Sequence, residues 1–329
     1  MDTSFQLGHT RSISDSVIQY KTLENMERYS DIPMSNPTKE NNFPNTSLTS
    51  AIEQSFSAQD FILTGENHEH KNGEESFQWI VCADGHGSQL PYYSNSVIAL
   101  LRKYDWNDFM QCSTAEEFTT TINDRLEEHN TYLSGATLSI VKIYSDHFDC
   151  YWVGDSEIRI YKDDEEVFRM NPHNHTNEAE LQRIEEMGID IRPTQNMKLL
   201  SEDRITMVDE GNYYYYTFSD GCNMTRSFGH NQGSKEFIEH VNVPRDNDGK
   251  YKVIVASDGL WDITEDFDEA VLKNRENEAQ QLVEFASNRW HQSWNYERED
   301  DGVLISSITH FEPGTKQIDD VCVATWIES

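Results

Sequence analysis

The chain has 329 residues, of which 36% are hydrophobic and 11% aromatic, enough for a full core and too many for a wholly disordered protein. Lysine and arginine number 26 against 59 aspartates and glutamates, and the formal net charge of −33 disfavours nucleic acid and anionic membranes as partners. No run approaches the roughly 20 apolar residues of a membrane helix, and the N-terminus carries no signal-peptide or transit-peptide pattern. We therefore expect a monomer that is cytoplasmic or nuclear and not secreted.

The five cysteines are odd in number and widely spaced, without a Cys-x-x-Cys pair. Cys82, Cys150 and Cys322 lie inside apolar runs, where a thiol usually packs as a small hydrophobic side chain. This usage predicts core residues and a reducing compartment.

Residues 1–50 are rich in Ser, Thr, Asn and Asp and show little periodicity, so we interpret them as a partly disordered extension. One added strand over Val17–Leu23 is the element expected there. Residues 51–329 alternate short strand-like runs with amphipathic helices and form one predicted domain.

The predicted strands are rich in β-branched and aromatic residues. They cover Phe77–Ala83, Thr137–Tyr144, Phe148–Gly154, Ile158–Tyr161, Tyr213–Ser219, Tyr251–Ala256 and Val321–Ile327. Apolar positions at helical spacing predict helices at 93–104, 118–126, 177–188 and 279–290. Because helices come in pairs between groups of strands, the pattern favours a layered α+β domain over a doubly wound parallel sheet.

Four aspartates occupy the same kind of position, at the end of a predicted buried strand. Asp84, Asp155 and Asp258 each follow a strand, and Asp319 leads into the last one. Buried charges at strand ends are costly unless they are compensated, and glycine beside them lets the backbone turn sharply or approach a ligand. If these ends converge, the carboxylates form an all-oxygen cluster that suits Mg²⁺ or Mn²⁺ rather than zinc.

Simpler interpretations stand beside this one. Any one of these aspartates, taken singly, is most simply a turn residue, because Asp-Gly is a common turn. The same holds for Asp220, whereas Asp262 is more consistent with a helix cap than with a ligand. The pairs His68/His70 and His173/His175 are interpreted as solvated, and Tyr213–Tyr216 as a strand with aromatic faces.

Eight short elements then occur in an order that resembles the type 2C (PPM) family of metal-dependent Ser/Thr protein phosphatases. Asp84-Gly85-His86-Gly87 matches the family's Asp-Gly-His-Gly signature, and residues 256–262 are nearly its Ala-Ser-Asp-Gly-Leu-Trp-Asp consensus. The remaining elements are residues 58–61, 135–137, 154–156, 173–188, 225–229 and 319–320. One such motif is a weak signal, but eight in register from about 55 to 327 are a strong one.

The resemblance implies a four-layer αββα sandwich, in which two antiparallel sheets are flanked by helix pairs. It implies two Mn²⁺ or Mg²⁺ ions, with Asp84 bridging both, the Gly85 carbonyl as a further ligand, and Asp258 and Asp319 on one ion. Asp60 lies near that ion, and Asp155 contributes to a third, weaker one. Asp84 and His86 are then the catalytic residues, with His86 as the acid for the leaving oxygen of a phosphoprotein substrate.

The sequence departs from the family pattern at several positions. Ser55 stands where the family usually has a phosphate-binding arginine, Ala58 where it has asparagine, and Ser88 where it often has glycine. His230 replaces the aspartate that usually closes the Arg-Phe-Gly element. Three hypotheses remain open: an active phosphoserine and phosphothreonine phosphatase, a pseudophosphatase that keeps the fold as a binding or regulatory module, and a phosphatase for a small phosphate ester.

Overall fold

The computed structural model describes most of the chain from residue 45 onward. The described residues are 45–55, 57–67, 76–87, 96–131, 133–215, 222–230, 238–300, 303–313, 315 and 317–329. The strand expected over Val17–Leu23 and the residues Ser88, Asp220, His68 and His70 lie outside them. The boundary at residue 50 stays a prediction, although the first described strand already begins at Thr46.

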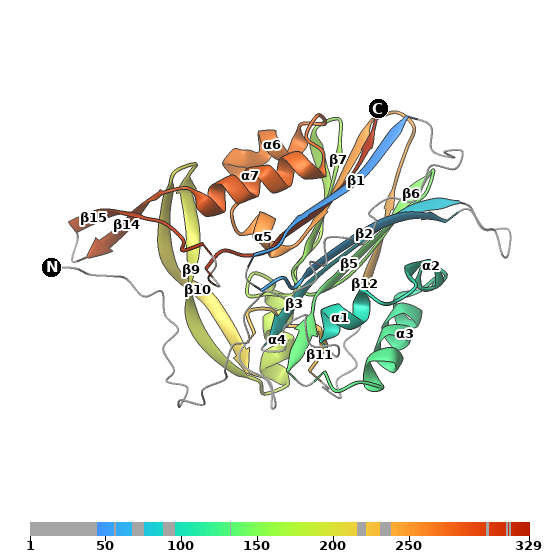
Figure 1. Cartoon of the computed structure of the whole chain (residues 1–329), viewed down its shortest axis with the longest axis horizontal. Helices are drawn as coiled ribbons and strands as arrows, with labels where there is room; N and C mark the ends of the chain where they lie inside the picture. The colour runs from blue at the N-terminus through green and yellow to red at the C-terminus, as the bar shows by residue number, and fades with distance from the viewer. Residues whose placement is uncertain are drawn as a thin grey trace, which may run out of the picture. The chain divides into compact units, whose positions relative to one another are not determined.

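Two antiparallel sheets lie at the centre of the domain (Figure 1). The first sheet has the strand order β1 (Thr46–Glu53), β16 (Val321–Glu328), β13 (Tyr251–Ala256), β7 (Glu157–Lys162) and β8 (Glu165–Arg169). The second has the order β11 (Phe228–Gly229), β4 (Ser134–Ala136), β3 (Phe77–Gly87), β5 (Leu138–Ile143), β6 (His147–Val153) and β12 (Glu239–Pro244), with β2 (Asp60–Asn67) paired to β3. Strands from distant parts of the sequence are therefore neighbours in both sheets.

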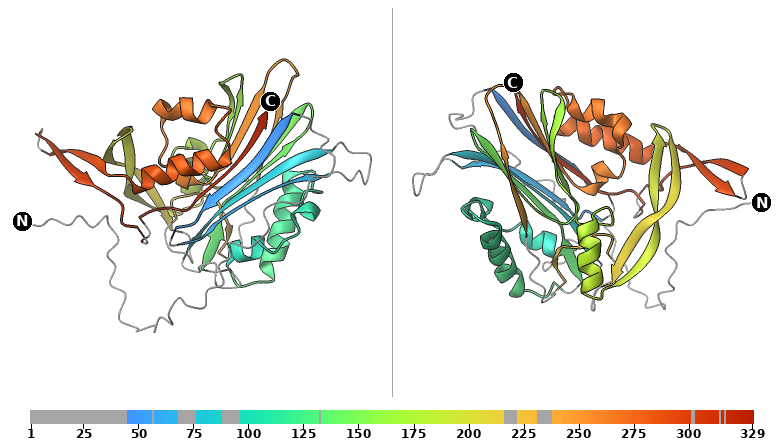
Figure 2. Two further views of the ribbon diagram at one scale, coloured as in Figure 1. Left: turned by 45° about the horizontal axis from the view of Figure 1, so that its top comes forward. Right: turned by 180° about the vertical axis from the view of Figure 1, so that it is seen from behind.

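Three separate hydrophobic clusters show that the domain has four layers. One cluster fills the space between the two sheets and includes Ile80, Val255 and Trp326. Another packs the second sheet against the helices α1 (Val97–Leu101), α2 (Trp106–Phe109) and α3 (Ala115–Glu127). The third packs the first sheet against α5 (Asp258–Trp261), α6 (Glu269–Lys273) and α7 (Ala279–His291). Figure 2 shows these helix groups on opposite outer faces, so the predicted αββα sandwich is confirmed.

The predicted helices are present, but with different ends: among the described residues the helix predicted at 93–104 is limited to α1, and the one predicted at 118–126 lies within α3. The short helices α2 and α6 were not predicted. In α3, Thr114 caps the N-terminus by accepting from the Glu117 amide, and the apolar positions Phe118, Ile122 and Leu126 are buried. The helix α4 (Glu178–Glu186) begins at Asn177, whose side chain accepts from the Glu180 amide. None of the described helices is both long and apolar enough to cross a membrane.

A third, smaller sheet was not predicted. Its order is β15 (Val303–Thr309), β14 (Trp294–Asp300), β10 (Arg204–Tyr215) and β9 (Asp190–Ser201), and the pairing of β10 with β14 is parallel. Most of its strand residues are polar and only partly buried, so they lack the continuous apolar runs that marked the central strands. Of the strand predicted over Tyr213–Ser219, the part up to Tyr215 belongs to β10, and the rest lies outside the described residues.

A buried ion pair fastens α7 to the segment that precedes α6. The Arg289 guanidinium donates to both carboxylate oxygens of Asp268 at 2.6 and 2.7 Å and to the carbonyl of Ile263 at 2.9 Å. Both side chains are almost fully buried, at 7% and 3% exposure. Removing one partner of such a pair leaves an uncompensated buried charge.

We therefore expect Arg289→Ala to lower the free energy of unfolding by about 3 kcal/mol. Urea unfolding followed by fluorescence measures the change. Arg192→Ala is the control, because the pair between Arg192 and Asp190 is half exposed, and it is expected to change stability by less than about 0.5 kcal/mol. Equal effects of the two variants would contradict a special role of burial.

Candidate active site

The pairing of β2 with β3 brings the first two aspartates together. In the antiparallel register, Asp60 lies directly opposite Asp84. The adjacent Gly85 amide donates to the carbonyl of Gln59 at 3.0 Å, so the two strands stay joined past this pair. Like charges at directly opposite positions destabilise a sheet, so this register is costly unless something else holds the carboxylates.

Three neighbouring strands of the first sheet bring the other three aspartates to one end of that sheet. β7, β13 and β16 are antiparallel neighbours, with Ala256 opposite both Glu157 and Val323. Asp258 follows the end of β13, whereas Asp155 and Asp319 precede the starts of β7 and β16. All three therefore project from the same end, as their strand-end positions predicted.

The glycine after Asp258 has a steric reason. A Cβ atom at Gly259 would lie 1.9 Å from the carbonyl oxygen of Asp320, which real side chains never approach so closely. The carbonyl of Gly259 accepts from the Trp290 indole at 2.7 Å, which fixes the turn against α7. The Asp-Gly-Leu-Trp segment thus holds Asp258 close to the Asp319–Asp320 backbone.

These carboxyl groups affect one another strongly. Burial, followed by the charges of Asp258, Asp60 and Asp319, raises the pKa of Asp84 well above its ordinary value. Burial also raises the pKa values of Asp60, Asp155, Asp258 and Asp319, and neighbouring carboxylates add to the effect at each. The cluster is therefore an electrostatically unfavourable concentration of negative charge that a cation would stabilise.

The donor set fits hard divalent cations. One carboxylate oxygen each of Asp60, Asp155 and Asp258 is buried and has no hydrogen-bond partner among the described residues. Buried carboxylate oxygens without partners are expensive, and oxygen-only ligands are those that Mg²⁺ and Mn²⁺ prefer. No three of these aspartates bring carboxylate oxygens within 4.8 Å of one another, so they do not form a single compact three-ligand site.

Several residues that support the aspartates were not identified from the sequence. The carboxylate of Asp320 accepts from the Ser57 hydroxyl at 2.7 Å and the Gln59 amide at 2.6 Å, and also from the Ser55 amide. Asp320 thus holds the 55–59 segment, while its neighbour Asp319 faces the cluster. Ser257 donates to Asp60 at 2.6 Å and so satisfies that carboxylate's other oxygen. The only signal for these contacts in the sequence is that the residues lie within or next to the motifs that occur in the family's order.

The Gly154–Asp155–Ser156 turn is fastened from two sides. Thr137 accepts from the Asp84 amide at 3.0 Å and lies 2.6 Å from the Ser156 hydroxyl, so it links two of the acidic positions. On the other side, His173 accepts from the Gly154 amide through Nδ1 at 3.0 Å. His173 is fully buried, so its interpretation as a solvated residue is wrong. Its contacts with Gly154 and Thr225 are tertiary contacts, which the polar residues around it in the sequence do not indicate.

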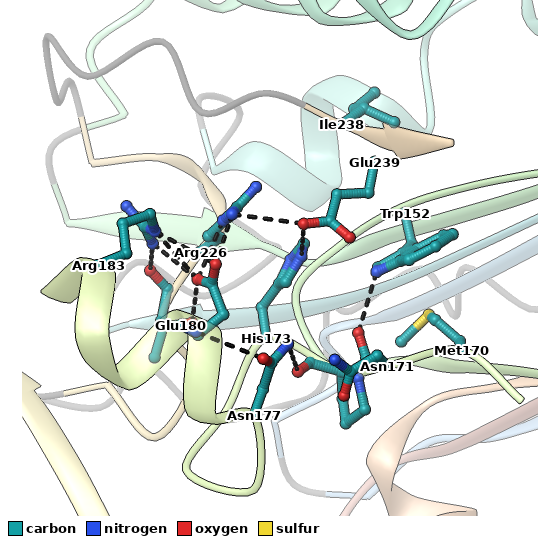
Figure 3. A network of polar contacts seen from close by, with 12 residues as sticks. Trp152, Met170, Asn171, His173, Asn177, Glu180, Arg183, Arg226, Ile238 and Glu239 are labelled. Carbon is teal, nitrogen blue, oxygen red and sulfur yellow. Dashed lines mark hydrogen bonds and ion pairs between the residues drawn. The ribbon is translucent and has the colours of Figure 1, made fainter. Parts of the chain in front are cut away.

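A network of ion pairs around Glu180 connects α4 to the segment that precedes β11 (Figure 3). Glu180 is 2% exposed and accepts from Arg226 at 3.0 Å, Arg183 at 2.9 Å and the Thr225 hydroxyl at 2.7 Å. Burial alone would raise the pKa of Glu180, but these hydrogen bonds outweigh it and lower the pKa to about 2. Arg226 thus has a structural role, because it holds the buried Glu180 carboxylate in place.

His86 lies two residues after Asp84, near the C-terminal end of the strand β3. Burial, with a smaller contribution from His230, lowers the pKa of His86 to about 3, so the imidazole is neutral at pH 7 in this structure. The ordinary pKa of a histidine side chain is about 6.5, so burial changes the protonation state expected of His86 near neutrality. As a neutral group, His86 can donate an N–H hydrogen bond but does not carry a stored proton.

One further residue, Asp262, lies at the acidic end. Asp262 is the C-terminal cap residue of α5, so it does cap a helix, although at the opposite end from a side-chain N-cap. Its side chain reaches the surface but is also packed among protein atoms; this packing, with the charges of Asp258 and Asp319, raises its pKa. Asp262 therefore belongs to the same field of negative charge.

A pocket of about 280 Å³ opens beside the cluster. Asp319 and Ser55 line it, together with Ser287, Trp290 and His291 from α7. None of the described residues that line it is lysine or arginine. The position of the missing arginine thus faces a pocket that reaches the acidic cluster.

The comparisons with known proteins identify the family. The model for protein phosphatase 2C matches residues 46–302, and the chain belongs to that family. A search of curated proteins finds no match. Among solved structures, a C. elegans sex-determining protein is similar with a TM-score of 0.55 and 15% identity, over 87% of this chain and 66% of that one.

Two other similar structures are named as phosphatases. The S. agalactiae serine/threonine phosphatase has a TM-score of 0.48 and 19% identity, over 86% of this chain and 99% of its own. The catalytic domain of the serine/threonine phosphatase PstP, solved with two manganese ions, has a TM-score of 0.45 and 12% identity, over 86% and 97%. At these identities the likeness concerns the fold.

The crowded carboxylates should make the metal-free protein less stable than its fold allows. We expect Asp84→Asn to raise the free energy of unfolding at pH 7 by about 1–2 kcal/mol when a chelator is present, because one uncompensated charge is lost. Urea unfolding measures this, with the exposed Asp124→Asn as a control of the same charge change.

The dependence on pH has a defined sign. Since the folded-state pKa values of these aspartates lie above the unfolded ones, the folded protein holds more protons near neutrality. The metal-free protein should therefore become more stable as the pH falls from 7 towards 5, and less so in Asp84→Asn. A variant less stable than the parent would show that the cluster is not strained.

Proposed function

We propose that this protein is a Mn²⁺- or Mg²⁺-dependent phosphatase that hydrolyses phosphoserine and phosphothreonine in proteins. The observation that carries the proposal is the convergence of five aspartates at one end of the sheets, three of them with a buried oxygen that lacks a partner among the described residues. Family membership supplies the reaction class, since the chain matches protein phosphatase 2C over most of its length.

We assign the metal ligands as Asp84, Gly85, Asp258 and Asp319, with Asp60 close by and Asp155 for a third, weaker ion. Asp84, Asp258 and Asp319 are partly accessible, whereas Asp60 and Asp155 are 1% and 7% exposed. The accessible three therefore face incoming ions and substrate. When bound, two ions would supply the Lewis acidity and the activated water that phosphoester hydrolysis requires.

The protein's own residues then have separate tasks. Asp320, Ser257 and Thr137 hold the ligand-bearing segments in place through the hydrogen bonds described above. His86 is assigned to the proton that the leaving oxygen needs. Because His86 is neutral at pH 7 in the metal-free structure, we assign it a donating N–H that is resupplied from water rather than a permanent positive charge.

A pseudophosphatase remains the second candidate, and one observation favours it. The pocket beside Asp319 has Ser55 where the family usually has arginine, and none of its described lining residues is lysine or arginine. Phosphate would then be held by the ions alone. The third hypothesis, a small phosphate ester as substrate, is an outcome that a comparison of substrates can select.

The direct test is hydrolysis of p-nitrophenyl phosphate and of a phosphoserine peptide, with and without Mn²⁺. We expect turnover only with metal, and a loss of at least about 100-fold in kcat for Asp258→Ala. Asp266→Ala, an exposed aspartate eight residues away, is the control. Metal binding without turnover would select the pseudophosphatase, and a preference for the small ester over the peptide would select the third hypothesis.

The Ser55 position offers a gain-of-function test. A charge-assisted hydrogen bond to phosphate contributes about 1.5–3 kcal/mol, so Ser55→Arg is expected to raise kcat/KM for a phosphopeptide by about 10-fold to 100-fold. Ser287→Arg adds the same charge on the α7 side of the same pocket and is the matched control. If both variants gain equally, the effect is general attraction and not phosphate binding at position 55.

A further inference from the structure

A second set of metal-type ligands lies close to the aspartates but has a different chemistry. The side chains of His86, Cys222 and His230 bring one nitrogen, one sulfur and one nitrogen within 4.8 Å of one another. The two imidazole rings have centroids 5.0 Å apart and are inclined by 35°. Both ring nitrogens of His86 are buried and lack a hydrogen-bond partner among the described residues.

The strand pairing of the second sheet brings His86 and His230 together. β4 lies between β3 and β11, and Gly135 in β4 is paired with both His86 and Gly229. A Cβ atom at Gly135 would lie 2.4 Å from His86 Nε2 and 2.6 Å from His230 Nε2, so only glycine lets both imidazoles close over this point. The backbone of His230, at φ 57°, is held by hydrogen bonds from its amide to the carbonyls of Thr131 and Ser134.

The third ligand comes from another part of the domain. Cys222 is bridged to Tyr214 of β10 by hydrogen bonds in both directions, at 2.7 and 3.1 Å. Its thiol is half-buried and is not part of a disulfide. The position of Cys222 is therefore fixed by the third sheet, and that of His230 by the second.

We propose that His86, Cys222 and His230 form a binding site for a zinc-class ion, separate from the aspartate cluster. Two imidazoles and one thiolate are the donor set that zinc prefers and that Mg²⁺ and Mn²⁺ do not. Zinc bonds of about 2.0–2.3 Å in tetrahedral geometry place ligand atoms about 3.3–3.8 Å apart. The three ligand atoms already lie within 4.8 Å of one another, so small rotations of the side chains are enough to reach this spacing.

A consequence rests on the proposed function. His86 is the residue to which we assign the proton of the leaving group, and a bound zinc-class ion would occupy its nitrogen. Zinc should then inhibit the phosphatase at a site that excess Mg²⁺ does not protect. This consequence fails by itself if His86 has no part in turnover, whereas the binding site does not depend on it.

The other ligand group within 4.8 Å, His173, Glu180 and Glu239, does not carry a similar proposal. Arg226 contacts both glutamates, and Arg183 contacts Glu180, so positive charge already occupies the space between the carboxylates (Figure 3). The two groups thus differ in charge. Arginine side chains compensate Glu180 and Glu239, whereas the group of His86, Cys222 and His230 contains no acidic side chain.

The test is titration of the whole protein with Co²⁺, a spectroscopic substitute for zinc, in saturating Mg²⁺ that fills the oxygen sites. We expect one equivalent to give a thiolate-to-cobalt charge-transfer band and tetrahedral visible bands, both displaced by Zn²⁺. A protein that shows only the weak spectrum of oxygen-ligated cobalt would overturn the proposal.

Two variants and one control make the assignment specific. Cys222→Ser should abolish the charge-transfer band and weaken Zn²⁺ binding by at least about 10-fold. His230→Asn should also weaken binding at least about 10-fold, and asparagine tolerates the positive φ of this position, so the backbone should be preserved. Cys112→Ser, which changes another half-buried thiol that lies near Thr121, should leave the spectrum unchanged. A band that survives Cys222→Ser, in a variant with the parent's unfolding midpoint, would assign the ion elsewhere and refute the site.

Inhibition is measured separately in the same samples. If zinc binds with the cobalt signature and inhibits, both the site and the role of His86 are supported. If it binds and leaves turnover unchanged, the site stands and the proposed role of His86 is wrong. If the phosphatase itself is inactive, the spectroscopic result still decides the site.

Discussion

The central constraint on the structure is the electrostatic repulsion between aspartates that strand pairing holds close together. The register of β2 on β3 sets Asp60 against Asp84, and the order of β7, β13 and β16 delivers three more aspartates to the same end of the neighbouring sheet. Hydrogen bonds along these strands and the hydrophobic cluster between the sheets hold the carboxylates together against their mutual charge. The stability of the two sheets therefore maintains a strongly negative, partly desolvated site, as expected where function and stability compete.

The supporting residues explain how a negative cluster keeps a defined geometry. Asp320 is bound to the amides and hydroxyl of Ser55, Ser57 and Gln59, so it is a structural residue beside Asp319, the predicted metal ligand. Ser257 bridges Asp60 to the amide of Cys322, and Thr137 bridges Asp84 to Ser156. Each bridge joins strands of different sheets or distant turns. Small hydroxyl residues, together with the Asp320 carboxylate, thus fix the segments that carry the clustered aspartates.

Those parts of the fold that could be predicted are the ones with strong one-dimensional signals. Runs such as Phe77–Ala83 and Tyr251–Ala256 are apolar throughout, because both faces of these central strands are covered, and the helices have one apolar face. β1 is weakly alternating and pairs with β16 at the other end of the domain. β14 and β15 pair with each other as neighbours in the sequence, but neither has a long apolar run like that of the central strands, so no local pattern marks them. For the site, strand-end aspartates and glycines gave the convergence, whereas the buried role of His173 and the lowered pKa of His86 arise from tertiary packing.

The departures from the family pattern have local physical consequences of different kinds. Ala58 has φ 51°, a left-handed conformation that asparagine, the family's usual residue there, tolerates better than alanine. Ser55 provides no positive charge to its pocket, and none of the pocket's described lining residues is lysine or arginine. At position 230 the substitution changes the chemistry of the neighbourhood, because an imidazole nitrogen lies beside His86 and Cys222 where the family usually has a carboxylate. The proposed site for hard ions and the proposed zinc-class site would then lie at opposite ends of one Asp-Gly-His segment, so an ion bound at one site would restrict the residues of the other.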